Sequence, residues 1–554
     1  MSVVTEQVKL QSLWQRSLLA SRSRLEAIES RLKPLDDRFN PILVKETRQA
    51  LKSRQFLITF GLILLFSFGW SLIGTFMQMP MVYYNPSAPT LLWGYYLLLA
   101  VPMLFVVPLA AFRSLAVEVD DGTLELLQVS TLSPTDIVLG KLCSALLQMM
   151  LYFVALVPCV SYAYTLRGID WNSLLVLLIL VLLTAIFLTV FGLFMATLPK
   201  GRSGQLFALI GVVAVLLAAE VIIGAQAAAL LTQNAVLSPW AQLFLSFSGL
   251  AIVLCFSWVL LTAAAAELAP VCANRSTKLR IALLVTQFVI IGLLSYGVLE
   301  LSKDLRQQNT MTAFDLQWLD AVPMVGIGVA GSWMFIGAMM AVESPTLTPR
   351  VRRDFPRSFV GRAMATFFMP GSATGVAFAL LAAAIGLVFA GVAFYHVEQI
   401  FSRLGSRYEI FNRFLFALFG YMCIGLLLIR ASGDLIRGVA DVRPRFGLAL
   451  LIIVALLTSL IPYSLYMIAA DYPSSPTYNY SQIINWAWTL KMISDGDAYL
   501  HYFVFAAGML AFGVHLISMR QIVLPQYIPT PTRVLEERDR LRWADQSVAD
   551  PLAP

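Results

Sequence analysis

Long apolar stretches recur through almost the whole chain of 554 residues and constrain its fold more than any other feature. A helix needs about 20 mostly apolar residues to cross a bilayer. Hydrophobic residues make up 59% of the chain and charged residues 13%, a balance that excludes a soluble enzyme and a disordered protein. We therefore expect an all-α polytopic membrane protein with about 12 transmembrane helices. The expected spans are Phe56 to Phe76, Leu91 to Phe112, Leu142 to Tyr164, Leu174 to Leu198, Gln205 to about Ala227, Leu243 to Leu268, Ile281 to Leu301, Ala321 to Val342, Gly371 to Tyr395, Phe411 to Ile429, Leu448 to Ala470 and His501 to Met519.

Lysine and arginine are distributed unequally between the segments that join these stretches. With the N-terminus inside, 32 of the 39 fall on the inner side and 7 on the outer side. This is the positive-inside pattern, so we expect both termini to be cytoplasmic. Five tryptophans fall in the outer loops, as an interfacial aromatic belt requires: Trp171, Trp240, Trp318, Trp486 and Trp488. The net charge of +7 therefore reflects membrane topology, and we expect no nucleic-acid partner.

Residues 1–55 carry no early apolar core, so we do not expect them to form a secretory signal. Within them, residues 1–33 are expected to form a helix, and the basic segment from Asn40 to Gln55 is expected to form another. In this second helix Ile42, Leu43 and Leu51 alternate with lysines and arginines, which is typical of an amphipathic helix on the inner headgroups. A simple stop on translocation explains the charges equally well but not the apolar positions.

Catalytic and metal-binding motifs are scarce. The chain has only three histidines and contains no HExxH, no GxSxG and no phosphate-binding loop of the form GxxxxGK[ST]. One GxGxxG match, from Gly326 to Gly331, lies inside an apolar span, where small residues let helices approach closely. The five cysteines have no paired spacing. We therefore expect no enzyme activity, and no metal or cofactor bound by this chain.

The loop between the second and third spans, residues 113–141, carries the most specific pattern. Asp120 and Asp121 favour a helix start, and a short helix from Thr123 to Val129 would place Leu124 and Leu127 on one face. The run from Ser133 to Asp136 is a second start signal, with Ser at the N-cap, Pro at the first helical position and an acid three residues after the cap. Such a rigid knob suits docking against another protein. A structured loop that merely joins two spans would need no exposed leucines.

The same residues resemble a known family. The run Gly122-Thr-Leu-Glu-Leu-Leu, followed by Leu132-Ser133 and by Ile137-Val-Leu-Gly140-Lys141, is similar to the permease subunits of type-2 ATP-binding-cassette (ABC) exporters. The segment that begins at Asn40-Pro41 resembles the elbow helix before their first span. The resemblance covers about residues 40–270, a six-span unit. It departs from the family at Thr131, where proline is usual.

The resemblance implies a transmembrane permease of an ATP-driven exporter, with a separate ATPase subunit that binds the ATP and docks on loop 113–141. It also implies a multi-pass protein of a bacterial cytoplasmic (inner) membrane. The residues expected to contact the ATPase are Glu118, Asp120, Gly122, Thr123, Leu124, Glu125, Leu127, Ser133, Gly140 and Lys141. Those of the elbow helix are Asn40, Pro41, Lys45, Glu46 and Arg48.

The rest of the chain is organised less clearly. We expect residues 1–55 to be a cytoplasmic and interfacial segment, 56–270 a six-span permease unit, 271–519 a second six-span unit, and 520–554 a cytoplasmic tail. In the second unit, Ala341-Val342-Glu343 faintly echoes Ala116-Val117-Glu118. This unit is either a divergent second permease half, which would make the chain a pseudo-dimer, or an unrelated extension on a permease that forms a homodimer. The long outer segment from Asp471 to Leu500 either covers a pathway or lies on the headgroups.

Glu220 is the one acid well inside an apolar stretch. An ionisable residue there is costly, which indicates a place on a substrate pathway. If the fifth span ends early, Glu220 instead caps a helix at the outer surface. The main rival to the exporter is an ion-coupled secondary transporter, for which 12 spans are also common. That rival predicts several buried charged residues near the midplane, and only Glu220 qualifies.

Overall fold

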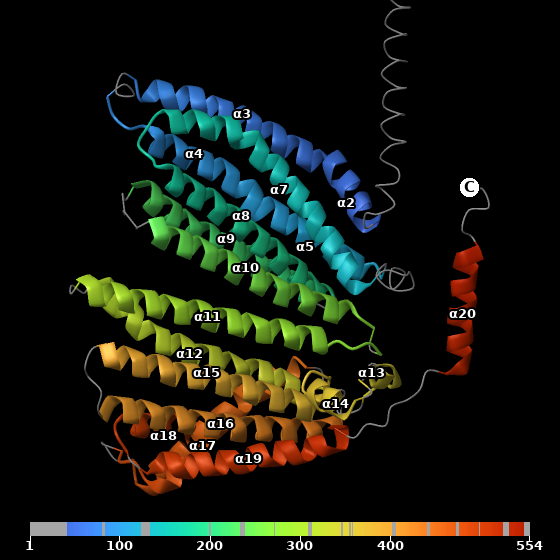
Figure 1. Ribbon diagram of the computed structural model, residues 1–554, viewed down its shortest axis with the longest axis vertical. Helices are drawn as coiled ribbons and strands as arrows, with labels where there is room; N and C mark the ends of the chain where they lie inside the picture. The colour runs from blue at the N-terminus through green and yellow to red at the C-terminus, as the bar shows by residue number, and fades with distance from the viewer. Residues whose placement is uncertain are drawn as a thin grey trace, which may run out of the picture. The chain divides into compact units, whose positions relative to one another are not determined.

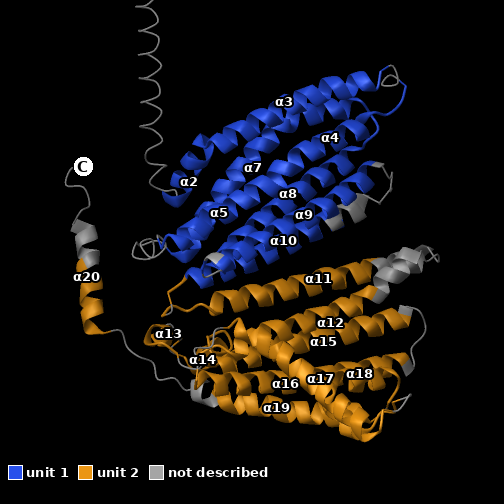
Figure 2. Cartoon of the chain, turned by 180° about the vertical axis from the view of Figure 1, so that it is seen from behind, with its two compact units in different colours: residues 1–268 blue, residues 269–554 orange. Residues whose placement is uncertain are grey.

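The computed structural model describes residues 41–79, 84–122, 133–198, 201–232, 239–270, 272–308, 313–344, 347–353, 356, 358–400, 406–439, 444–472, 476–497, 499–523 and 531–547 (Figure 1). These residues are helical or lie in short connections, and none of them forms a strand. Twelve of the described helices are long and apolar enough to cross a membrane, which confirms the expected all-α polytopic membrane fold. The chain divides into two compact units, residues 1–268 and residues 269–554 (Figure 2).

In its described residues, unit 1 contains one short helix followed by six spans. The short helix α2 ends one residue before the first span begins, as the amphipathic pattern predicts. The second span is a continuous run of three elements, in which a π-helical turn separates two α-helices. Pro102 and Pro108 lie at the starts of the second and third of these elements, where proline's missing N–H prevents regular α-helical hydrogen bonding. The elements are α2 (Pro41–Lys52), α3 (Arg54–Met77), α4 (Ala88–Ala100), η2 (Val101–Val106), α5 (Val107–Asp120), α7 (Pro134–Thr165), α8 (Trp171–Thr197), α9 (Arg202–Thr232) and α10 (Pro239–Leu268).

The fourth span, α8, is the central helix of unit 1. It packs against α5, α7, α9 and α10, and its buried residues belong to one continuous apolar core. Its start is capped by Asp170, whose carboxylate accepts a hydrogen bond from the backbone N–H of Ser173. Hydrogen bonds from Ser173 lower the pKa of Asp170, because they favour the ionised carboxylate. The outermost helix, α3, instead exposes large apolar side chains along most of its length, as a helix facing lipid does.

Unit 2 also has six spans, together with short helices in two of its connections. Between the second and third spans lie α13 and α14, and between the fifth and sixth lie η3 and α18. The spans are α11 (Thr277–Gln308), α12 (Ala313–Ala341), α15 (Ser372–Ile400), α16 (Ser406–Arg437), α17 (Phe446–Ala469) and α19 (Leu500–Val523). The shorter elements are α13 (Pro349–Arg353), α14 (Phe359–Thr366), η3 (Tyr480–Ile484), α18 (Trp486–Ser494) and, after the last span, α20 (Thr532–Ser547).

The six spans of each unit pack in the same pairs. In both units the first span contacts the second and third, and the second also contacts the third, fourth and fifth. The third span contacts the fourth and sixth, and the fourth contacts the fifth and sixth. The two halves of the chain therefore share one pattern of helix packing, although their sequences share only a faint echo.

The connection between the fifth and sixth spans of unit 2 contains η3 and α18. Gln482 donates a hydrogen bond to the carbonyl of Pro462 at 2.9 Å, and the indole of Trp486 donates to the carbonyl of Ala455 at 3.1 Å. Ala455 lies roughly 21 Å along α17 from the end of this helix at Ala469, at about 1.5 Å per residue. The segment around η3 and α18 therefore packs along α17 and reaches well into the length of that helix.

Candidate functional site

Three residues that the sequence analysis selected from separate motifs meet in unit 1. The ammonium of Lys141, at the start of α7, lies 3.0 Å from a carboxylate oxygen of Glu46 on α2. It lies 3.1 Å from a carboxylate oxygen of Glu118, near the end of α5. The Lys141 side chain is 2% exposed, and its Nζ also lies 3.4 Å from Oγ of Ser114. We call Glu46, Glu118 and Lys141 the ionic cluster.

The ionic cluster joins three helices at the end of unit 1 that the charge distribution predicts to be cytoplasmic. Helix α2 buries Ile42 and packs along α7, which brings Glu46 to the lysine. A buried lysine is tolerated when carboxylates neutralise it, and two are present here. Lys45, the residue before Glu46, is 64% exposed and lies 4.0 Å from Glu118. The elbow segment and the two ends of loop 113–141 are therefore held together by one cation.

The start of α7 has the capping arrangement that its sequence predicts. The Ser133 hydroxyl accepts a hydrogen bond from the backbone N–H of Asp136, and the Ser133 backbone N–H donates to the Asp136 carboxylate. Pro134 occupies the first helical position. This capping box satisfies two backbone groups that would otherwise lack partners, so α7 begins at a defined residue after the loop.

The other predicted residues of this region have different positions. Asp120 and Gly122 are exposed at the end of α5, and Gly122 has a left-handed φ of +67°, a conformation that favours glycine. Gly140 is buried beside Lys141, while Pro41 and Arg48 are exposed on α2. The remaining predicted residues, Asn40, Thr123, Leu124, Glu125 and Leu127, lie outside the described residues.

Unit 2 contains a buried ion pair that the sequence analysis did not find. Arg280, near the start of α11, is fully buried, and its guanidinium lies 2.8 Å from the carboxylate of Glu343 at the end of α12. It also donates hydrogen bonds to the carbonyls of Phe367 and Met369, before the start of α15. The backbone N–H of Gly371 donates to the same Glu343 carboxylate at 2.9 Å. A single arginine thus ties the starts of the first and third spans to the end of the second.

In both units a glutamate at the end of the second span pairs with a buried cation, but the cation comes from a different span in each unit. Glu118 and Glu343 each lie at the end of the second span of their unit, and each pairs with a buried cation. The cation comes from the third span in unit 1 and from the first span in unit 2. The faint echo between Ala116-Val117-Glu118 and Ala341-Val342-Glu343 was the available signal for Glu343. Nothing local in the sequence distinguishes Arg280 from other arginines at the ends of spans.

Glu220 lies in the interior of α9, which is continuous from Arg202 to Thr232. The fifth span therefore does not end before Glu220, and this acid does not cap a helix. It lies roughly 18 Å from the end of the helix at Thr232, at about 1.5 Å per residue. One of its carboxylate oxygens is buried and has no hydrogen-bond partner in the part of the chain that the structure describes.

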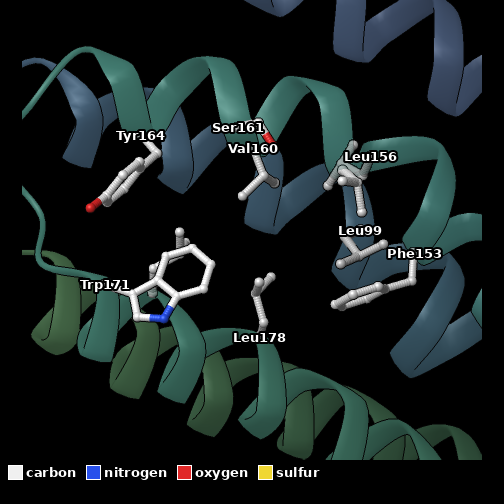
Figure 3. A pocket seen from close by; sticks show the side chains of 10 residues that line it. Leu99, Phe153, Leu156, Val160, Ser161, Tyr164, Trp171 and Leu178 are labelled. Atoms are coloured by element: carbon white, nitrogen blue, oxygen red, sulfur yellow. The ribbon is translucent and has the colours of Figure 1, made fainter.

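An apolar cavity of about 270 Å³ lies between α4, α7 and α8 of unit 1 (Figure 3). Leucine, valine and aromatic side chains line most of it, among them Leu99, Phe153 and Leu178. Ser161, Tyr164 and Trp171 provide its few polar atoms. Because no lining residue is charged, the cavity suits an apolar group and offers nothing to recognise a charge.

Metal binding receives no support from the part of the chain that the structure describes, where no group of three or more His, Cys, Asp or Glu side chains is placed to hold an ion. The features that stand out are the ionic cluster beside loop 113–141, the Arg280–Glu343 pair and the isolated Glu220. No family model, curated protein or solved structure matches the chain.

Proposed function

We propose that this chain is the permease subunit of an ATP-driven exporter of the type-2 ABC class, and that a separate ATPase subunit docks on loop 113–141. The observation that carries the proposal is the ionic cluster. It fixes two residues of the loop, Glu118 near its start and Lys141 at its end, to each other and to Glu46 on the elbow helix. One residue of the elbow helix and two residues from the ends of loop 113–141 thus lie together in space, which supports a docking element at this place.

The cluster gives such a loop a mechanical role. A force applied to the loop reaches α5 through Glu118, α7 through the capping box and Lys141, and α2 through Glu46. These helices then respond together, because a buried ion pair and a packed helix shift as units. Closure of the ATPase on ATP would move the loop as a lever, and the spans would alternate access between the two sides of the membrane. In this proposal the chain itself catalyses no covalent reaction and binds no nucleotide.

The same proposal extends to the second half of the chain. We assign unit 2 as a divergent second permease half, so that one chain corresponds to a pseudo-dimer. The shared pattern of packing between the spans supports this assignment, because an unrelated extension has no reason to repeat it. The 32-to-7 distribution of lysine and arginine supports cytoplasmic termini, and the bacterial inner membrane follows from the resemblance to the exporter family.

Affinity purification from the native membrane in mild detergent tests the partner. The wild type is compared with the double variant Leu124→Asp, Leu127→Asp and with the matched variant Val534→Asp, Leu535→Asp, which places the same charges on the exposed tail helix α20. We expect a protein with a phosphate-binding loop to co-purify in stoichiometric amount with the wild type and the tail variant. It should be lost from the loop variant, whose thermal stability in detergent must match that of the wild type.

Glu220 favours one alternative function, an ion-coupled secondary transporter. A lone carboxylate inside a span is typical of proton or ion coupling. This alternative predicts that no ATPase accompanies the wild type and that transport in proteoliposomes depends on an ion gradient. Transport that requires the partner and ATP, and that persists without a gradient, would exclude it.

A further inference from the structure

The turn of α9 that follows Glu220 lies against two aromatic side chains of the second span. Helices α4 and α9 pack against each other, and Gly224 lies one turn after Glu220 on the same face of α9. A Cβ atom built on Gly224 would lie 3.6 Å from the hydroxyl oxygen of Tyr96 and 4.0 Å from the ring of Trp93. The absence of a side chain at Gly224 therefore leaves the Tyr96 hydroxyl next to the turn that carries Glu220.

Tyr96 and Trp93 form a preorganised aromatic pair. Their rings are stacked with centroids 5.3 Å apart and an interplanar angle of 18°. Tyr96 is 4% exposed, and its hydroxyl has no hydrogen-bond partner among the described residues. Two unsatisfied polar groups, a carboxylate oxygen and a phenol, thus lie on facing helices inside the spans.

Two buried polar groups without partners destabilise the folded protein, so packing of the helices alone does not explain them. A buried polar group without a hydrogen bond costs free energy, and the cost is higher where no water is present to replace the missing partner. Two apolar side chains would pack the same helices together without that cost. A ligand that satisfies both groups accounts for their presence.

We propose that Trp93, Tyr96 and Glu220 form a binding site for a lipophilic cation, an organic ammonium or similar ion with an apolar body. The carboxylate supplies the opposite charge, and the faces of the two rings attract a cation. A small metal ion fits poorly, because it requires about six oxygen ligands and this group supplies few. The proposal rests on the proposed function, since it names the class of substrate that the exporter carries.

A direct binding measurement tests the site without the partner. The full-length chain is purified in detergent, and equilibrium binding of radiolabelled tetraphenylphosphonium is compared with that of tetraphenylborate, an anion of nearly the same shape. We expect saturable binding of the cation by the wild type and at least a tenfold loss of affinity in Glu220→Gln. The anion should not bind more weakly to Glu220→Gln than to the wild type.

Three further variants separate recognition from folding. Tyr96→Phe removes only the hydroxyl and should weaken cation binding about threefold, whereas Gly224→Leu should abolish it by filling the space beside Tyr96. Glu398→Gln neutralises a buried acid of unit 2 and should leave binding unchanged. Equal cation binding by the wild type, Glu220→Gln and Gly224→Leu, or no saturable binding by the wild type, would overturn the proposal.

The two proposals fail separately. Binding is measured on the chain alone, without ATPase or ATP, so a missing ATPase partner leaves the binding result intact. Conversely, an ATPase that co-purifies with a chain that binds no cation supports the exporter and removes this substrate class.

Discussion

At the residue scale, Lys141 stabilises the arrangement of three helices, because two carboxylates depend on its charge. Replacing it with methionine keeps the length of the side chain but leaves Glu46 and Glu118 without their cation. Removal of one partner from a buried ion pair is strongly destabilising, and we expect Lys141→Met to lower the free energy of unfolding by roughly 3 kcal/mol. Thermal unfolding in detergent measures this loss.

Lys45 provides the matched control for that variant. It lies in the same cluster of charges but is 64% exposed and 4.0 Å from Glu118. An exposed ion pair contributes about 0–1 kcal/mol to stability. The free energy of unfolding of Lys45→Met should therefore be close to that of the wild type. Equal losses in the two variants would mean that burial of Lys141 has no energetic importance.

Arg280 makes a second prediction at this scale. Its planar guanidinium contacts one carboxylate and two carbonyls, which an ammonium cannot reproduce in one geometry. We therefore expect Arg280→Lys to destabilise unit 2 clearly and Arg280→Met to do so more. Arg413→Met, which removes an exposed pair with Glu409 on a single helix, is the control and should change little. If Arg280→Lys melted at the same temperature as the wild type, the planar geometry of the guanidinium would not be important for stability.

The sequence points to all three members of the ionic cluster but does not show that they contact one another. Glu46, Glu118 and Lys141 were each selected by a local motif, yet Glu46 and Lys141 are 95 positions apart. Only the packing of α2 on α7 brings them together. Arg280 could not be found at all, because two of its partners are backbone carbonyls, which leave no trace in a sequence.

At the element scale, α16 and α19 approach each other closely at a pair of glycines. A Cβ atom built on Gly508 would lie 2.4 Å from Cα of Gly420, so the two backbones touch without side chains between them. We expect Gly508→Val to separate these helices and lower the thermal stability of the protein. Gly513 lies on the same helix, and a Cβ there would meet nothing within 4 Å. Gly513→Val should therefore be tolerated, and a similar loss in both variants would point to helix propensity as the cause.

The start of α7 supplies another prediction for a single element. Ser133→Ala removes the N-cap hydroxyl and should cost about 1 kcal/mol, concentrated in the first turn of the helix. Hydrogen exchange followed by mass spectrometry should show faster exchange in the segment that begins at Pro134. The same change at the cap of α14, Ser358→Ala, should leave this segment unchanged. Unaltered exchange in Ser133→Ala would mean that packing alone fixes the start of α7.

The spans could be predicted because length and apolar composition suffice for them. The segment after α17 could not, because it is short and contains polar residues such as Gln482, Asn485 and Thr489. These three are buried nonetheless, each with a hydrogen bond to neighbouring groups. A polar residue is expected at the surface only when no hydrogen-bond partner is available inside the protein. A partner that is distant along the chain cannot be identified from the sequence.

At the scale of the whole molecule, the repeated packing pattern shows that the two units are built alike. The distribution of lysine and arginine instead predicts which side of the membrane each connection faces. This predicted orientation can be tested on an existing side chain. Cys272 is exposed in the connection between the two units, which the charge distribution places on the cytoplasmic side.

A membrane-impermeant maleimide tests this orientation in intact cells. We expect Cys272 to react only after the cells are broken, with Cys272→Ser as the unlabelled control. The variant Tyr472→Cys in that serine background places a thiol at an exposed position of the opposite side, 68% exposed in the wild type, and should react in intact cells. The other cysteines lie inside spans, where a thiol is less reactive because its charged thiolate is disfavoured. Labelling of Cys272 in intact cells would contradict the predicted orientation. Loop 113–141 would then face away from any cytoplasmic ATPase.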